Sequence, residues 1–276
     1  MAAHIAGALN RVVQGIRGPW MAFAHSCPDD LRFWHHQTAQ FSAWYRTVAF
    51  DLPGFGHSPD ALAGMTIPDV AAACWEGIDA LTDEKLILQG NSYGGEVVLR
   101  MVEQRPERVL ALVISSCGYT PGREFAHGWV KQYGERDIAV RREQLTGHFS
   151  PALRETPMAR HYVDMICETS RGNAASIVNT YRALGEPVPE SVYATIRVPT
   201  LVIQSDGGRN PAGGIRLSQK IPGAELAMIA GAGHHSNLEQ PWEFNRLVFD
   251  FLARHGLHNR VGIRRESTRL PVKYAS

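Results

Sequence analysis

The sequence predicts an α/β fold with a doubly wound, mostly parallel β-sheet. Two observations carry this prediction. Short apolar runs bounded by Gly, Pro or Asp lack polar alternation, as is typical of strands buried on both faces of a parallel sheet. Amphipathic stretches with helical spacing lie between these runs, so strands and helices alternate along the chain. The 276 residues, 44% of them hydrophobic, are enough for one large α/β domain and exclude a disordered chain.

The strands and helices of this sheet can be placed in chain order. The expected strands are residues 20–24, 47–51, 86–89, 109–115, 200–204 and 226–229. The first long helix should begin at Thr66, because Pro68 suits a first turn and Asp69 lies near the positive end of the helix dipole. Further helices are expected over residues 93–104, 212–221 and 241–254.

The alternation of strands and helices stops between residues 118 and 196. This segment has helical spacing, many aromatic residues and few strand-like runs, which favours a helical cap inserted between two strands. A further pair of ordinary crossover helices is the alternative. The expected organisation is therefore a core made of residues 1–117 and 197–255, a cap over 118–196 and a basic C-terminal tail over 256–276. The tail is expected to be solvated or to contact a second copy in a homodimer.

Composition excludes several classes of function. With 28 Lys and Arg against 27 Asp and Glu, the net charge of +1 argues against a nucleic-acid partner. No run of eighteen apolar residues is present, and the N-terminus lacks the pattern of a signal peptide, so neither a membrane partner nor secretion is expected. The four cysteines show no metal-like spacing, which favours reduced thiols in the cytoplasm. No metal is expected, and Gly54-Phe55-Gly56 lacks the third glycine of a nicotinamide or flavin site, so no cofactor is expected either.

The most informative motif is a Gly-x-Ser-x-Gly sequence formed by Gly90, Ser92 and Gly94. It stands between an expected strand and an expected helix. A serine on such a strained turn projects its hydroxyl from the sheet edge, and side chains two residues away on either side would collide. The helix that follows directs its backbone N–H groups at a developing oxyanion. This placement predicts that Ser92 is a nucleophile.

A serine hydroxyl needs a base at neutral pH. Of the 12 histidines, His234 stands in a comparable setting, in the Gly-rich loop 231–241 between the last expected strand and the last helix. That loop reaches the same sheet edge as Ser92. His234 is therefore the predicted base, and His235 is expected to shape the loop.

Taken together, these motifs resemble the α/β-hydrolase superfamily, over residues 19 to 252. The runs that carry the resemblance are residues 90–95, the loop 231–241, His25-Ser26-Cys27 after the first buried strand and residues 50–58. Within the superfamily the chain is most similar to the 3-oxoadipate enol-lactonase-like branch, on residues 18–26, 148–151, 196–203 and 235–241. The resemblance implies a doubly wound sheet with a helical cap inserted after the sixth strand.

The resemblance also implies roles for single residues. Ser92 would be the nucleophile, and His234 would be the general base and then the acid. The backbone N–H groups of Cys27 and Tyr93 would form the oxyanion hole. Relatives carry strand-Gly-x-x-Asp for the third member of the triad, and here Gly208 takes the place of that aspartate.

Asp206 is the carboxylate that remains in this loop, and it is the predicted orienting acid. Alternatively Asp206 is a turn residue and the acid is supplied elsewhere, with Glu124 as a distant candidate, or is absent. The expected substrate contacts are Ser26 and four cap aromatics, Trp129, Tyr133, Phe149 and Tyr162, although each aromatic can equally belong to the core of the cap.

The expected function is a serine hydrolase that cleaves a small to medium carboxylic ester or (enol-)lactone, a small-molecule substrate. Two alternatives remain open. One is a carbon–carbon bond hydrolase with the same fold and site. The other is a non-hydrolytic lyase or binding protein that has lost its acid at Gly208.

Overall fold

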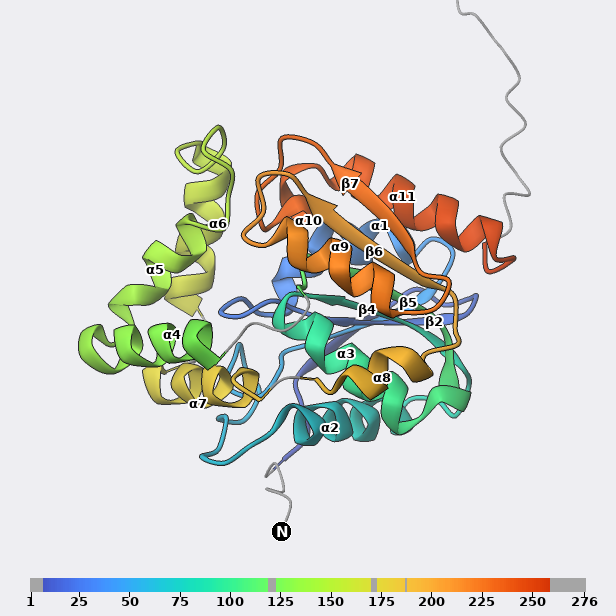
Figure 1. The fold of residues 1–276 in the computed structure, drawn as a ribbon, viewed down its shortest axis with the longest axis horizontal. Coiled ribbons are helices and arrows are strands. Elements are labelled where there is room, and N and C mark those ends of the chain that lie inside the picture. The colour runs from blue at the N-terminus through green and yellow to red at the C-terminus, as the bar shows by residue number, and fades with distance from the viewer. Residues whose placement is uncertain (1–6, 119–122, 170–172, 187, 259–276) are drawn as a thin grey trace, which may run out of the picture.

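The computed structural model describes residues 7–118, 123–169, 173–186 and 188–258, and its centre is a seven-stranded sheet (Figure 1). The strands are β1 (Arg11–Gln14), β2 (Trp20–Ala24), β3 (Arg46–Phe50), β4 (Leu86–Asn91), β5 (Val109–Ser115), β6 (Thr200–Ser205) and β7 (Glu225–Ile229). Their order is β1-β3-β2-β4-β5-β6-β7, with β1 antiparallel to β3 and every other pair parallel. The predicted fold class is confirmed.

The predicted strands all form, and the sheet has one strand more. Strands β2 and β5 have the predicted bounds, and the others differ by one or two residues at an end. The additional strand, β1, lies at the sheet edge and pairs Arg11 with Phe50 and Gln14 with Thr47. Its side chains are largely exposed, so it lacks the continuous apolar run by which buried strands are recognised.

Helices cover both faces of the sheet (Figure 1). Helices α2 (Ile67–Asp79), α3 (Tyr93–Gln104), α8 (Glu190–Thr195) and α9 (Pro211–Lys220) contribute to one apolar core cluster, whereas α11 (Pro241–Arg254) and the end of α1 (His35–Phe41) contribute to the other. Short helices complete the core: η1 (Leu31–Trp34), η2 (Pro106–Arg108) and α10 (Ser236–Glu239). Helix α2 begins where the sequence predicts, because Thr66 and Asp69 form a reciprocal capping box.

Four helices form the segment between β5 and α8. They are α4 (Arg123–Arg136), α5 (Ala139–Thr146), α6 (Pro157–Thr169) and α7 (Ala174–Leu184), and they lie together beside the carboxyl end of the sheet (Figure 1). The chain then returns through α8, which packs against α3. The insertion follows the fifth strand of the described sheet, whereas the resemblance implies the sixth, because a single strand precedes β2.

Two remaining features bear on the sequence-based expectations. The described residues include no helix that is both long enough and apolar enough to cross a bilayer. The basic tail lies outside the described residues beyond position 258, so its expected role in a homodimer stays a prediction.

Candidate active site

Ser92 occupies a strained turn between β4 and α3. Its backbone has φ 51° and ψ −113°, in the left-handed region that non-glycine residues rarely adopt. A Cβ on Gly90 would collide with the Gly94 carbonyl, and a Cβ on Gly94 would collide with the Ala24 carbonyl. Glycine is therefore required at both positions. The Ser92 N–H donates to the Ser115 carbonyl at 2.9 Å, which ties this turn to β5.

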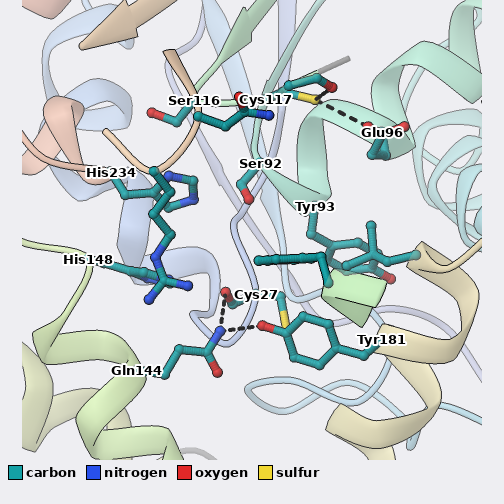
Figure 2. Close-up of a pocket in the computed structure, with 15 residues that line it drawn as sticks. Cys27, Ser92, Tyr93, Glu96, Ser116, Cys117, Gln144, His148, Tyr181 and His234 are labelled. Carbon is teal, nitrogen blue, oxygen red and sulfur yellow. Dashed lines mark hydrogen bonds between the residues drawn. The ribbon is translucent and has the colours of Figure 1, made fainter. Parts of the chain in front are cut away.

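A cavity of about 310 Å³ opens above this turn (Figure 2). Core and cap both contribute to its wall. The lining residues are Cys27, Ser92, Tyr93, Glu96, Ser116, Cys117, Gly118, Phe125, Gln144, His148, Tyr181, Leu184, Arg209, Asn210 and His234. The predicted nucleophile, the predicted base and both predicted oxyanion donors are all members of this set.

His234 comes from the loop between β7 and α10. Its N–H donates to the His148 carbonyl at 2.7 Å, and the preceding Gly233 N–H donates to Glu239 Oε1 at 2.9 Å. Burial, followed by the charge of Arg209 and the neighbouring His235 ring, lowers the pKa of His234 well below its ordinary value. The ring is therefore neutral at neutral pH and has one bare nitrogen, as a general base must.

Ser92 and His234 share the cavity without a direct hydrogen bond. No hydrogen bond within the described ranges joins the Ser92 hydroxyl to the His234 ring, although both residues line the same space. Catalytic hydrogen bonds are often long in unliganded sites and shorten when substrate binds. The arrangement is compatible with a serine–histidine pair.

The proposed oxyanion donors lie on two different elements. Tyr93 is the first residue of α3, so its N–H has no partner inside the helix. Cys27 follows β2, and its carbonyl accepts a hydrogen bond from Gln144 Nε2 at 3.4 Å. Both residues border the cavity that Ser92 also lines (Figure 2), and their role as an oxyanion hole stays a prediction.

Neither cysteine in the cavity is an alternative nucleophile. Burial raises the pKa of the Cys27 thiol and that of the Cys117 thiol well above the ordinary value, so neither forms the reactive thiolate at neutral pH. The Cys117 thiol donates to Glu96 Oε1 at 3.4 Å. Burial also raises the pKa of Glu96 to about 7, against smaller opposing effects of Cys117 and Arg100.

Asp206 does not reach His234 in this structure. It is exposed, and its Oδ1 accepts a hydrogen bond from the Gly231 N–H at 2.7 Å. Gly208 leaves the usual acid position without a side chain, and a Cβ built there would lie 2.9 Å from Ser205 Oγ. Glu124 is exposed in the first turn of α4. Within the described residues, no carboxylate hydrogen-bonds to the His234 ring.

The predicted substrate contacts lie behind the cavity wall. Tyr133 donates to Gln144 Oε1 at 2.7 Å, and Tyr162 donates to Asp29 Oδ1 at 2.7 Å. Phe149 packs against Tyr162, with ring centroids 5.8 Å apart. These three side chains are buried core of the cap, and none of them borders the cavity.

Ser26 and Trp129 also lie behind the residues that line the cavity. Ser26 is fully buried, and its hydroxyl donates to the Cys27 carbonyl at 3.4 Å. Trp129 lies beneath the Arg209 guanidinium, whose carbon is 5.2 Å from the ring centroid, and stacks on Tyr181. Both residues support side chains that line the cavity and do not line it themselves.

Sequence reasoning missed several residues of the cavity wall, and two of them, Arg209 and His148, lie beside the predicted base. Arg209 directly follows the glycine at the acid position, and this neighbourhood is the signal that could have found it. His148 belongs to the cap segment 148–151, one of the runs that carry the resemblance, but its sequence neighbours do not show that it meets the His234 loop. That contact is tertiary.

Asp29, His148 and His235 form a buried cluster beside the cavity. Their candidate ligand atoms all lie within 4.8 Å of one another, a spacing that can hold a metal ion. The same atoms also bond directly, because His235 Nε2 lies 3.1 Å from Asp29 Oδ2 and 2.9 Å from His148 Nδ1. Hydrogen bonds therefore account for the approach of these atoms.

The fold and the site together define an α/β protein with a strained serine on a strand-to-helix turn. A family model described as alpha/beta hydrolase fold matches residues 19–241, and the chain belongs to this family. The predicted superfamily is thereby confirmed.

Curated relatives of this chain have different names. A dihydrolipoyllysine-residue acetyltransferase component of an acetoin cleaving system from Cupriavidus necator is 27% identical over 82% of this chain, which spans only 61% of that relative's length. A 2-hydroxy-6-oxononadienedioate/2-hydroxy-6-oxononatrienedioate hydrolase from Klebsiella pneumoniae is 27% identical over 77% of this chain and 78% of its own.

Solved structures share the fold over nearly the whole chain. The enol-lactonase from Burkholderia xenovorans LB400 has a TM-score of 0.83 at 23% identity, covering 91% of this chain and 99% of its own. Est816, described as an N-acyl homoserine lactone degrading enzyme, has a TM-score of 0.76 at 25% identity, covering 90% of this chain and 100% of its own. At 23% identity the likeness to the enol-lactonase shows the fold alone.

Proposed function

We propose that this protein is a serine hydrolase that cleaves a small to medium carboxylic ester or (enol-)lactone through an acyl-enzyme. The observation that carries the proposal is the strained backbone of Ser92, with φ 51°, at the floor of a cavity that His234, Cys27 and Tyr93 also line. Strained, left-handed residues cluster at active sites, and the two obligatory glycines around Ser92 are those of a nucleophile turn. The cavity of about 310 Å³ suits a small substrate.

The mechanism follows from the positions of these groups. Ser92 Oγ attacks the carbonyl carbon while His234 takes its proton. The oxyanion that forms accepts hydrogen bonds from the N–H groups of Cys27 and Tyr93, each worth about 3–4 kcal/mol in such sites. His234 then protonates the leaving alcohol or enolate, the ester bond breaks, and water repeats both steps on the acyl-enzyme.

A carbon–carbon bond hydrolase remains the second candidate. Curated relatives named 2-hydroxy-6-oxononadienedioate hydrolases favour it, and its reaction would use the same serine and histidine. An (enol-)lactone and a vinylogous diketone assayed side by side with one enzyme preparation separate the two functions. A kcat/KM that is larger for the lactone supports the first proposal.

Fluorophosphonate labelling tests the nucleophile. The reagent should modify the wild-type protein, and peptide mass spectrometry should locate the adduct on Ser92. Ser92→Ala should abolish both labelling and aryl-ester hydrolysis, whereas Ser116→Ala should still be labelled, although Ser116 lines the same cavity with a left-handed φ of 48°. Hydrolysis by Ser92→Ala at the wild-type rate would refute the mechanism.

A further inference from the structure

His148 joins the cap to the loop that holds the proposed base. It lies just after α5, and its carbonyl accepts hydrogen bonds from the N–H groups of His234, at 2.7 Å, and of His235, at 3.3 Å. Its ring is 1% exposed, borders the cavity and lies 4.8 Å from the His234 ring, centroid to centroid (Figure 2). One edge of this ring is bonded inside the protein, because Nδ1 faces His235.

The buried carboxylate of Asp29 sets the direction of the hydrogen bonds behind His148. Asp29 Oδ1 accepts from the Tyr162 hydroxyl at 2.7 Å, and Oδ2 lies 3.1 Å from His235 Nε2. Burial alone would raise the pKa of Asp29, but the His235 ring and the Tyr162 hydroxyl outweigh it and lower the pKa. Asp29 is therefore ionised and can only accept, so His235 Nε2 must carry a proton.

The proton on His235 fixes the tautomer of His148. His235 Nε2–H donates toward both Asp29 Oδ2 and His148 Nδ1, at 3.1 and 2.9 Å, so His148 Nδ1 must present a lone pair. Burial, followed by the charge of Arg209, lowers the pKa of His148 well below its ordinary value, which leaves one proton on the ring. That proton is on Nε2. His148 lines the cavity while its Nδ1 is turned to His235, so Nε2 is the ring nitrogen left to face the cavity.

We propose that His148 donates its Nε2–H to an oxygen of the bound substrate, and that Asp29 and His235 are positioning residues that hold His148 in this donor tautomer. The kinetic test of this inference rests on the proposed hydrolysis, whereas the tautomer of His148 can be tested without it. It assigns a third donor to the site, supplied by the cap, beside the two backbone donors of Cys27 and Tyr93. The substrate it fits carries a second oxygen, such as a carbonyl or enolate oxygen, beyond the one held in the oxyanion hole.

The tautomer can be measured without any activity. Long-range ¹H–¹⁵N spectra of protein labelled with ¹⁵N-histidine distinguish a protonated from an unprotonated ring nitrogen, and loss of one signal set in His148→Gln assigns the residue. We expect His148 to show a bare Nδ1 and a protonated Nε2 at neutral pH. A proton on Nδ1 would overturn the proposal, whatever the enzyme hydrolyses.

Two substitutions at His148 separate a donor from a base. Glutamine places an N–H close to the position of Nε2, whereas leucine fills the space without a donor. We expect His148→Leu to lower kcat/KM for the substrate by about 10- to 100-fold, the worth of one hydrogen bond to a charged oxygen. His148→Gln should recover most of that loss. If both variants lose activity equally, His148 is not a donor.

Asp29→Asn tests the positioning role. Without the carboxylate, His235 Nε2 no longer has to carry a proton, so it can accept from His148 Nδ1–H, which leaves His148 Nε2 bare. The spectra should then show the opposite tautomer for His148, and kcat/KM should fall as it does in His148→Leu. In the His148→Gln background, the same change at Asp29 should have less than about threefold effect, because a coupled pair is not additive.

The outcomes also separate this inference from the function on which it rests. If no ester or lactone is hydrolysed while His148 keeps the donor tautomer and Asp29→Asn reverses it, the proposed function fails and the tautomer assignment stands. If Asp29→Asn lowers kcat/KM by the same factor in the wild-type and in the His148→Gln background, Asp29 does not act through His148 and the positioning role is refuted. A stoichiometric metal ion in the purified protein that Asp29→Asn releases would overturn the hydrogen-bond assignment itself.

Discussion

The substitution Asp206→Asn tests whether the carboxylate beside β6 orients His234. Removing a true orienting acid lowers turnover by on the order of 10⁴. Asp206 instead accepts one hydrogen bond, from the Gly231 N–H at 2.7 Å, and its side chain is exposed. Asparagine keeps an acceptor oxygen at that place, so the free energy of unfolding should fall by less than about 1 kcal/mol. The charge that is lost is exposed to solvent, so its effect on the activation free energy should be ~0.6 kcal/mol, and kcat/KM should fall by less than about threefold.

The assay is kcat/KM for an aryl ester across a pH series, with urea unfolding of the same preparations. His234→Ala provides the scale of a full loss, and Asp206→Ala shows the additional effect of removing the acceptor. A loss above about 100-fold in Asp206→Asn, with unchanged stability, would show that the loop moves and that Asp206 does orient the histidine. Gly208→Asp is the converse test, and a gain in kcat would show that the position is still suited to an acid.

Two further predictions concern the cavity wall and the nucleophile turn. The charge of Arg209 disfavours protonation of His234, so Arg209→Met should raise the pKa of His234 and move the acid limb of the kcat/KM pH profile to higher pH. Arg209→Lys keeps the charge and should leave the acid limb in place. An acid limb that does not move in the Met variant contradicts this reasoning. Gly94→Ala places a Cβ against the Ala24 carbonyl, and urea unfolding should show a loss of about 1–3 kcal/mol or more. Gly128→Ala, in open space on α4, is the matched control and should stabilise slightly, so equal losses would disprove the steric origin.

The parts of the fold that were predictable are those coded by local pattern. Strand β5 and helix α3 were placed to the residue, because a fully buried strand and a turn with obligatory glycines each leave a signature within a dozen positions. Helix α1 was missed because its sequence, His-His-Gln-Thr-Ala-Gln-Phe, lacks an apolar stripe. It is held by the buried Phe41 at its end and by polar contacts made far along the chain, such as Gln37 Nε2 to Asn245 Oδ1 at 2.9 Å.

The site likewise has a part that local sequence patterns predict and a part that only tertiary packing determines. That Ser92 and His234 line one cavity was predictable, because each follows a strand end and the sheet brings strand ends together. The cap aromatics could not be sorted into cavity wall and cap core, since that depends on side-chain directions set by helix packing. Phe125 and Tyr181 face the cavity, whereas Tyr133 sits one layer behind. A motif places a residue on an element but does not fix which neighbour covers it.

The main-chain bond from His234 to His148 has a mechanical consequence. The imidazole that would accept the serine proton is supported by the inserted helices rather than by the strands alone. His148 directly follows α5, so any displacement of α5 that carried His148 with it would break this bond and shift the loop that holds His234.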